Sequence, residues 1–330
     1  MFRKGNIGIP TSFAFIRKQT PMHPVVLLRK QFDDGAEAPV AAKHFPVVSL
    51  RGEVPPASLV VGRYACLPYY SELAADLALQ GSALINSVQQ HSYVANFDYY
   101  ADIRDFTFPT WFALHEIPFE LRGGPFVVKG RTNSRKLQWS THMFAENFQA
   151  AVRLSGDLAN DPFIGPQGLV FRQYVPLETL EVGLNGTPIT NEWRLFFYKD
   201  KLLAHGYYWA IIDDLELIEK ARPAFESEGL PFAKMVAARL KDKVNFFVLD
   251  IARTAAGQWV VVEVNDGQQS GLNYFVQPEE LYANLASAIS EEFGRMALQE
   301  LREVVHGTHT GRVSSAVEAV SNTPKSGGPA

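Results

Sequence analysis

Two apolar segments, residues 245–250 and 259–265, constrain the fold of this chain more than any other feature. Both are rich in β-branched and aromatic residues, and the short stretch between them contains Gly257. This pattern predicts a β-hairpin. A four-residue loop over residues 255–258 then sets three opposite pairs, which are Thr254 with Trp259, Ala252 with Val261, and Asp250 with Glu263.

The predicted hairpin gathers acidic and amide groups on one face. Side chains alternate along a strand, so Asn265 shares the face of Glu263, and Asp250 lies opposite. Two carboxylates facing each other repel, which indicates a cation between them. An all-oxygen set of two carboxylates and an amide suits Mg²⁺ better than zinc. The alternative is a plain acidic cluster at the end of a surface hairpin.

Composition indicates an ordinary globular protein. The chain has 330 residues, 47% of them hydrophobic and 20% charged, which suffices for two domains with proper cores. A net charge of −4 argues against a protein whose main task is binding nucleic acid, although a local basic groove stays open. The single cysteine, Cys66, excludes an intrachain disulfide framework. Without an 18-residue apolar run or a secretory signal, we expect a soluble cytoplasmic protein with no membrane association.

The first third of the chain predicts a loosely attached arm, residues 1–21, and a small α/β domain, residues 22–110. Strand-like and helical segments alternate in this domain, as is typical of α/β folds. The predicted strands are residues 24–28, 47–50, 58–62 and 83–85, and the predicted helices are residues 70–80 and 93–106.

Residues 111–305 have a different pattern, which predicts an α+β region with strands and helices in separate runs. Residues 306–330 are rich in Gly, Ser, Thr and Pro and predict a disordered tail, so its His306 and His309 are not expected to bind a metal. The predicted strands of the α+β region are residues 125–129, 169–175, 191–198 and 201–209, and its helices are residues 141–154 (after Ser140 as N-cap), 231–241 and 278–304.

Six short motifs follow one another in an informative order: Leu84-Ile-Asn86, a helix around Asp98, Phe106-Thr-Phe-Pro109-Thr110, Phe126-Val-Val-Lys129, Val170-Phe-Arg-Gln-Tyr-Val175, and Asp250 with Glu263-Val-Asn265. In this order they resemble the ATP-grasp superfamily of ATP-dependent ligases, over residues 24–300. The resemblance implies an α/β domain followed by an α+β region whose two sheets clasp ATP.

The chain departs from that family in three places. Tyr99 follows Asp98 where a lysine is frequent, and the phosphate loop, residues 130–136, has one glycine and three cations. Residues 266–272 replace a proline–glycine loop. These departures resemble a divergent clade with two arginines and one lysine at the phosphate site, and the candidates for this trio are Arg172, Arg194 and Lys129.

The resemblance implies roles for the metal and phosphate groups. Asp250, Glu263 and Asn265 would hold Mg²⁺, which bridges the β- and γ-phosphates. Lys129 would hold phosphate oxygens, unless it is a solvated lysine at a strand end. Three further cations would close over the triphosphate or belong to a solvated loop; they are Arg131, Arg135 and Lys136.

It also implies roles for the hinge and the clamp. Gln173, Tyr174 and Val175 would bind adenine through their backbone, and Glu178 would bind the ribose, with Glu181 as the alternative. Arg194 would clamp the γ-phosphate or the acyl phosphate, or else form an ion pair with Glu192 on an exposed sheet. For Arg172, solvent exposure and phosphate binding stay equally open.

The resemblance therefore predicts an enzyme, an ATP- and Mg²⁺-dependent ligase that forms a C–N bond between a carboxylate and an amine through an acyl phosphate. Its substrates would be small molecules or peptides, and its oligomeric state stays open. Two other classes remain: an ATP-dependent kinase or macromolecule-end ligase on the same scaffold, and a catalytically degenerate nucleotide-binding regulatory protein. No general base for the amine is evident in the sequence.

Overall fold

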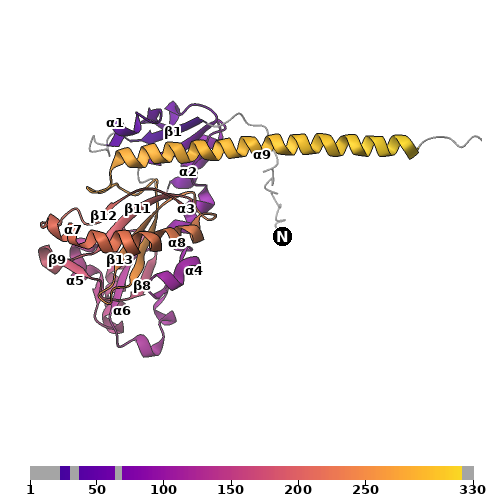
Figure 1. The fold of residues 1–330 in the computed structure, drawn as a ribbon. Helices are drawn as coiled ribbons and strands as arrows, with labels where there is room; N and C mark the ends of the chain where they lie inside the picture. Colours follow the sequence, from indigo (N-terminus) through magenta and orange to yellow (C-terminus); the bar gives the residue numbers. More distant parts are fainter. Residues whose placement is uncertain (1–22, 30–36, 64–68, 322–330) are drawn as a thin grey trace, which may run out of the picture. The chain divides into compact units, whose positions relative to one another are not determined.

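The computed structural model describes residues 23–29, 37–63 and 69–321. The predicted arm at residues 1–21 and Cys66 lie outside these described residues. Within them, no helix is long and apolar enough to cross a membrane. The described strands form three four-stranded sheets and one two-stranded sheet (Figure 1).

The first sheet is parallel and has the strand order β2-β1-β3-β4. One face is covered by α2, whose Leu73 and Leu77 lie at a helical spacing of four and pack with Leu27 and Val60. The alternation of strands and helices predicts this arrangement. The elements are β1 (His23–Leu28), α1 (Glu37–Ala41), β2 (Val47–Val48), β3 (Ser58–Arg63), α2 (Tyr70–Ala78) and β4 (Ala83–Leu84).

The segment that follows does not form the single predicted helix over residues 93–106. It forms α3 (Val88–Ala95) and α4 (Tyr100–Ile103), separated by Phe97 with φ of 68°. A left-handed residue ends an α-helix, and side-chain period alone does not reveal it. Residues of α3 and α4 contribute to the core under the third sheet, namely Val94, Phe97, Tyr99 and Ile103.

The second sheet is antiparallel, with the order β5-β8-β6-β7 and α6 against it. The predicted helix over residues 141–154 is wrong, because Asn147 caps α6 by accepting a hydrogen bond from the Ala150 amide at 3.0 Å. The elements are β5 (Thr110–Trp111), β6 (Phe126–Gly130), α5 (Trp139–His142), β7 (Phe144–Ala145), α6 (Phe148–Ala159) and β8 (Leu169–Gln173).

The third sheet is antiparallel, with the order β12-β11-β13-β14. Two helices lie across one face of it (Figure 1), and their buried side chains join the central core with Leu195 and Leu249. The other face is left for the site. The elements are β11 (Glu192–Tyr198), β12 (Lys201–Tyr207), α7 (Leu215–Ala224), α8 (Leu230–Leu240), β13 (Phe246–Arg253) and β14 (Trp259–Asp266); a separate pair is formed by β9 (Thr179–Val182) and β10 (Pro188–Thr190).

The hairpin of β13 and β14 has the predicted pair Asp250 opposite Glu263. Near the turn the register differs by one, because Ile251 lies opposite Val261 and Arg253 lies opposite Trp259. The loop is therefore one residue longer than predicted, and Gly257 with φ of 84° lies in it. An irregularity at Val262 restores the predicted register beyond it, as a β-bulge does.

A buried polar network joins the end of β14 to the first part of the chain. The Asp266 carboxylate accepts hydrogen bonds from Asn86 Nδ2 and the Gln268 amide, each at 2.9 Å, and it contacts His91 Nδ1 at 2.9 Å. His91 in turn stacks on Tyr70 with a centroid distance of 3.8 Å. These contacts fix the position of the segment that follows β14.

The last described element is α9 (Pro278–Ser321). It continues past the predicted end at residue 304 and into the segment predicted to be disordered, and the first proline after Pro278 is Pro324. The chain divides into two compact units, residues 1–285 and 286–330, so α9 contributes to both.

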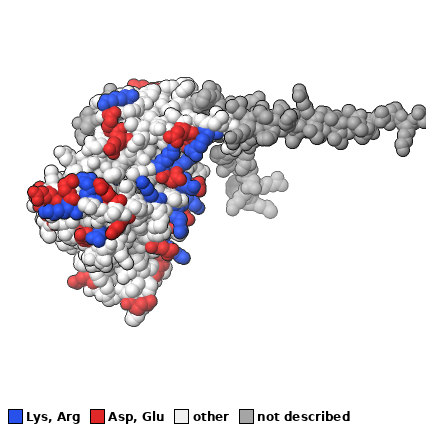
Figure 2. Space-filling view, viewed as in Figure 1, with Lys and Arg blue, Asp and Glu red and all other residues white. Residues whose placement is uncertain are grey.

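Figure 2 shows acidic and basic side chains interspersed on the face drawn, with uncharged surface between them.

Candidate nucleotide and metal site

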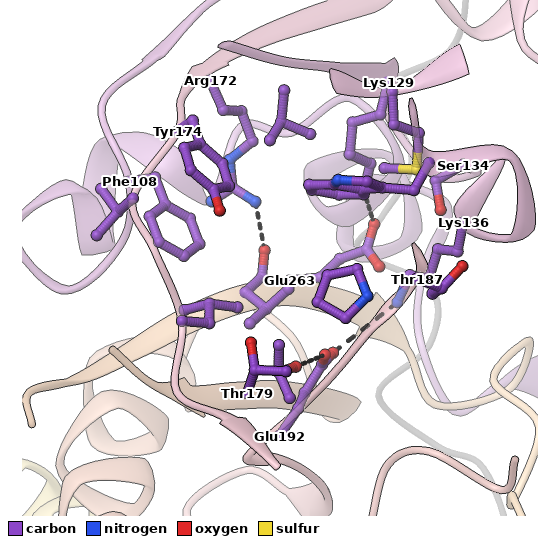
Figure 3. A pocket seen from close by; sticks show the side chains of 18 of the residues that line it. Phe108, Lys129, Ser134, Lys136, Arg172, Tyr174, Thr179, Thr187, Glu192 and Glu263 are labelled. Atoms are coloured by element: carbon purple, nitrogen blue, oxygen red, sulfur yellow. Dashed lines mark hydrogen bonds and ion pairs between the residues drawn. The ribbon is translucent and has the colours of Figure 1, made fainter. Parts of the chain in front are cut away.

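Two adjoining cavities lie at the open face of the third sheet. The first, here called the apolar cavity, is lined by β6 and β8 on one side, by β11 and β14 on the other, and by β9 and β10 at its edge. The second, here called the polar cavity, is lined by residues 132–138 and 269–271 together with Arg194 and Tyr208. Ser134, Lys136 and Glu263 line both cavities, so the two adjoin at these residues (Figure 3).

Arg194 and Asp250 form a bidentate pair across β11 and β13. The guanidinium donates from Nε and Nη2 to the two carboxylate oxygens at 2.8 Å each. Burial alone would lower the pKa of Arg194, but the charge of Asp250 raises it well above its usual value. Arg194 Nη1 also donates to the carbonyl of Gly271 at 3.0 Å, so the arginine connects the sheet to the loop of the polar cavity.

Lys129 and Glu263 form a buried ion pair between the second and third sheets (Figure 3). Burial lowers the pKa of Lys129, and Glu263 partly offsets this effect. Burial alone would raise the pKa of Glu263, but Lys129 and Lys136 together hold it below its usual value. Lys129 is therefore a buried charge facing a carboxylate, and not a solvated lysine at a strand end.

Lys136 lies where the two cavities meet. Its Nζ donates to the hydroxyl of Tyr208 at 2.5 Å and lies 4.0 Å from the centre of that ring. The carboxylate of Glu192 is 3.8 Å away. Lys136, from the cationic loop, therefore belongs to the site, with its charge delivered to a buried point rather than to solvent.

Glu192 is a buried carboxyl with one oxygen uncommitted. It is 2% exposed, its Oε2 accepts a hydrogen bond from Thr190 at 3.3 Å, and its Oε1 has no hydrogen-bond partner among the described residues. Burial raises the pKa of Glu192 to about 7, although the charge of Lys136 opposes this shift. The carboxyl lines the apolar cavity, and Arg194 pairs with Asp250 rather than with Glu192.

Arg172 lines the apolar cavity but is held on three sides by the protein. Its Nη1 donates to the Val262 carbonyl at 2.5 Å, and its Nη2 donates to Thr107 Oγ1 at 2.6 Å. Its guanidinium lies 4.7 Å from the ring centre of Phe108. Because Val262 is the irregular residue of β14, Arg172 fixes the strand next to Glu263.

The segment Gln173–Val175 lines the apolar cavity with its backbone partly used. The Gln173 amide donates to the Pro109 carbonyl at 2.9 Å, and the Tyr174 amide donates to the Pro125 carbonyl at 3.0 Å. Pro125 has no N–H to return a bond to Tyr174. Among the described residues, neither the Tyr174 carbonyl nor the Val175 amide has a backbone partner.

Four other predicted site residues have their side chains engaged elsewhere. Glu178 binds Asn191 Nδ2 at 3.0 Å and lies outside both cavity linings. Glu181 accepts hydrogen bonds from the amides of residues 213 and 214 at 3.2 Å each. Arg131 lies 5.6 Å from the ring centre of Phe112 and also lines neither cavity. Arg135 lines the polar cavity and donates to Asp161 at 2.8 Å.

Sequence reasoning missed the hydroxyl and aromatic groups of the apolar cavity. Their motif carries no signal, because they come from short elements that the hydrophobic period does not reveal. The only available hint is the run of three threonines in and around β9 and β10. The missed lining residues are Phe108, Trp139, Thr179, Thr187, Thr190 and Trp209.

The donor chemistry around Asp250, Glu263 and Asn265 fits a hard cation. All three come from β13 and β14, and Asn265 Nδ2 lies 3.4 Å from Asp250 Oδ2. Among the described residues, no group of three or more His, Cys, Asp or Glu side chains forms a metal cluster by itself. The set thus offers two carboxylates and an amide, which suits Mg²⁺ accompanied by phosphate oxygens rather than an all-protein cage.

Comparison with solved structures agrees with this architecture. The structure titled D-cycloserine synthetase DcsG matches with a TM-score of 0.52 and 14% identity, covering 81% of this chain and 99% of that chain. Two weaker matches have similar coverage. D-alanine–D-alanine ligase from Bacillus anthracis complexed with ATP has a TM-score of 0.49 and 13% identity, covering 84% of this chain and 98% of that chain. The ATP-grasp ligase PsnB, with a minimal precursor variant, Mg and ADP, has a TM-score of 0.47 and 13% identity, covering 82% of this chain and 100% of that chain.

No relative among the curated proteins matches this chain. A family model does match, over residues 119–285, which is half of the chain and contains both cavities except Phe108. Its description is that of an ATP-grasp domain, the third family of one clade of such domains. The predicted fold class is confirmed, and the chain belongs to the ATP-grasp family.

Proposed function

We propose that this protein is an ATP- and Mg²⁺-dependent ligase that joins a carboxylate to an amine through an acyl phosphate. One observation carries the proposal: an apolar cavity adjoins a polar one at Lys136 and Glu263, with Lys129 beside them. An adenosine needs the first environment. A triphosphate with its metal and an acyl acceptor needs the second.

The apolar cavity suits the nucleoside. The unbonded Tyr174 carbonyl and Val175 amide would bind the edge of adenine, while Phe108 and Trp139 offer faces for the ring. Glu192, rather than Glu178, has an uncommitted carboxylate oxygen at this cavity. We assign Glu192 to the ribose hydroxyls, because a buried acceptor without a partner is stabilised by a hydroxyl donor.

The phosphate groups would lie where the two cavities adjoin. Lys129 and Lys136 supply positive charge there, and Arg194 supplies a planar guanidinium on the side of the polar cavity. Asp250, Glu263 and Asn265 would hold Mg²⁺, which neutralises charge on the phosphates when it is bound. Arg131 is left out of this assignment, and Arg172 is assigned the support of β14 beside Glu263.

Arg194 would orient the reacting oxygen atoms. A substrate carboxylate oxygen attacks the γ-phosphorus, the bond from phosphorus to ADP breaks, and an acyl phosphate forms. The amine then attacks the carbonyl carbon and loses a proton, and the carbon–oxygen bond to phosphate breaks. Positioned cations stabilise both steps without covalent participation of the protein.

The test couples three products to one carboxylate. The protein is incubated with ATP, Mg²⁺, pooled carboxylic acids and hydroxylamine, which traps an acyl phosphate as a hydroxamate. Equal amounts of ADP, phosphate and hydroxamate are expected, falling by roughly 100-fold in Glu263→Gln. The exposed Lys43→Met serves as the matched control, because Lys43 pairs only with Glu279 at 2.8 Å away from the cavities.

The other functions predict different products. ADP and a stable phosphorylated acceptor without free phosphate would replace the proposal by a kinase. ATP binding with no ADP formed by any acid would replace it by a nucleotide-binding regulatory protein.

A further inference from the structure

The wall of the polar cavity differs in kind from that of the apolar cavity. Its described lining side chains are charged, hydroxyl or amide groups, together with one aromatic ring, that of Tyr208, and Gly271. No aliphatic side chain lines it among the described residues, whereas valine, leucine and methionine line the apolar cavity. This contrast carries information about the acyl donor, which has to bind beyond the phosphates.

Several polar groups of this wall are not used by the protein itself. The side chains of Asn133, Ser134 and Gln138 have no hydrogen bond to another described residue, although all three line the polar cavity. The neighbouring Arg135 and Arg194, by contrast, are held by carboxylates. The segment 133–138 thus presents donors and acceptors that a bound molecule can use.

The size of the polar cavity suits a small molecule. Its volume is about 620 Å³. This lies within the range of roughly 300–1,000 Å³ that is typical of small-molecule sites. An acid with an aliphatic or aromatic tail would bury its tail against polar groups and leave them without partners, which opposes binding. An acid with hydroxyl, amide or ammonium groups would satisfy them.

We infer that the acyl donor is a small hydrophilic carboxylic acid, of the size of an amino acid or a dipeptide, bound by the segment 133–138, and not a fatty or phenylalkanoic acid. The inference rests on the proposed ligase function, since it concerns the carboxylate that is activated. Gln138 is the residue we assign to specificity: its amide reaches the polar cavity from outside the cluster of ion pairs.

The experiment measures binding, which requires no turnover. The full protein saturated with Mg²⁺ and ADP is titrated with the common amino acids and glycyl dipeptides, and with fatty and phenylalkanoic acids of matched length. The best hydrophilic acid is expected to bind at least about tenfold more tightly than the best apolar acid. Gln138→Leu is expected to reduce this ratio by about tenfold, and Gln89→Leu, the same exchange at an exposed position of α3, should leave it unchanged.

Equal or tighter binding of an apolar acid overturns the inference, as does binding of no hydrophilic acid or an unchanged ratio in Gln138→Leu. The proposed function is judged separately by the products formed. Turnover of an apolar acid that depends on Glu263 would leave the ligase standing and remove the inference. Selective binding of hydrophilic acids without ADP formation would do the reverse.

Discussion

Arg194 binds both carboxylate oxygens of Asp250 at 2.8 Å, and Asp250 is fully buried. The two residues lie opposite each other on β11 and β13. A buried carboxylate with a bidentate arginine keeps its charge, whereas one without a partner is strongly unfavourable. The pair is therefore part of the stability of the third sheet as well as of the candidate site.

Arg194→Met should destabilise the protein by about 3–5 kcal/mol, because it leaves the charge of Asp250 buried without a partner. The double variant Arg194→Met with Asp250→Asn should recover part of that loss, since no unpaired charge remains. Urea unfolding measures both. The matched control is Lys220→Met, whose partner Glu216 lies 3.6 Å away with both side chains largely exposed, and little change is expected there. A double variant as unstable as the sum of the single variants would contradict this account.

The ion pair of Lys129 and Glu263 leads to a prediction about binding. In the absence of ligands each neutralises the other, yet phosphate needs Lys129 and metal needs Glu263. Occupation of one group therefore releases the other, so nucleotide and metal should bind with positive cooperativity. In Lys129→Met, Mg²⁺ alone should bind more tightly than to the wild-type protein, while the affinity for Mg²⁺ with ADP should fall by about 10–100-fold.

Titration calorimetry with Mg²⁺ alone, ADP alone and both together measures this coupling. Lys43→Met should behave like the wild-type protein in all three titrations. Additive binding free energies in the wild-type protein would rule out the exchange.

The hairpin shows how far sequence carries and where it stops. Alternation and the position of Gly257 predict two facing strands and the pair Asp250–Glu263. The predicted register is nevertheless off by one near the turn, and a bulge at Val262 compensates. The Val262 carbonyl accepts a hydrogen bond from Arg172, 90 residues away in sequence, and a local pattern does not contain such a contact.

Other parts of the site depended on contacts that only the fold reveals. A strand ending in Lys129 is readable from its apolar run, but its burial against Glu263 needs the second and third sheets to meet. Glu178 and Glu192 look alike in sequence. In the structure the first is bound by Asn191, and the second keeps a free oxygen at the apolar cavity.

The pKa of Glu192 predicts a pH dependence of stability. Burial raises it to about 7 from the ordinary value of 4.5. Between these two pH values the folded protein keeps a proton that the unfolded chain releases. The stabilisation from the protonated carboxyl is thus complete below pH 4.5, decreases as the pH rises, and is lost above about pH 7.

Glu192→Gln removes this dependence. The free energy of unfolding of the variant, relative to that of the wild-type protein, should rise by about 3 kcal/mol between pH 4 and pH 8. Urea unfolding over this range measures the difference, and Glu120→Gln at an exposed position of the chain is the control. Parallel curves for Glu192→Gln and the wild-type protein would show that the carboxyl titrates normally.

The adenine assignment rests on the backbone of Val175, so it requires a change that removes an N–H. Val175→Pro does so, and Val175→Ala shortens the side chain while keeping the amide. The proline variant should bind ATP at least about tenfold more weakly, because the adenine edge loses a hydrogen bond in a buried site. The alanine variant should stay within a few-fold of the wild-type affinity. Melting temperatures establish that both variants fold, and equal ATP affinities in folded variants would move adenine away from Gln173–Val175.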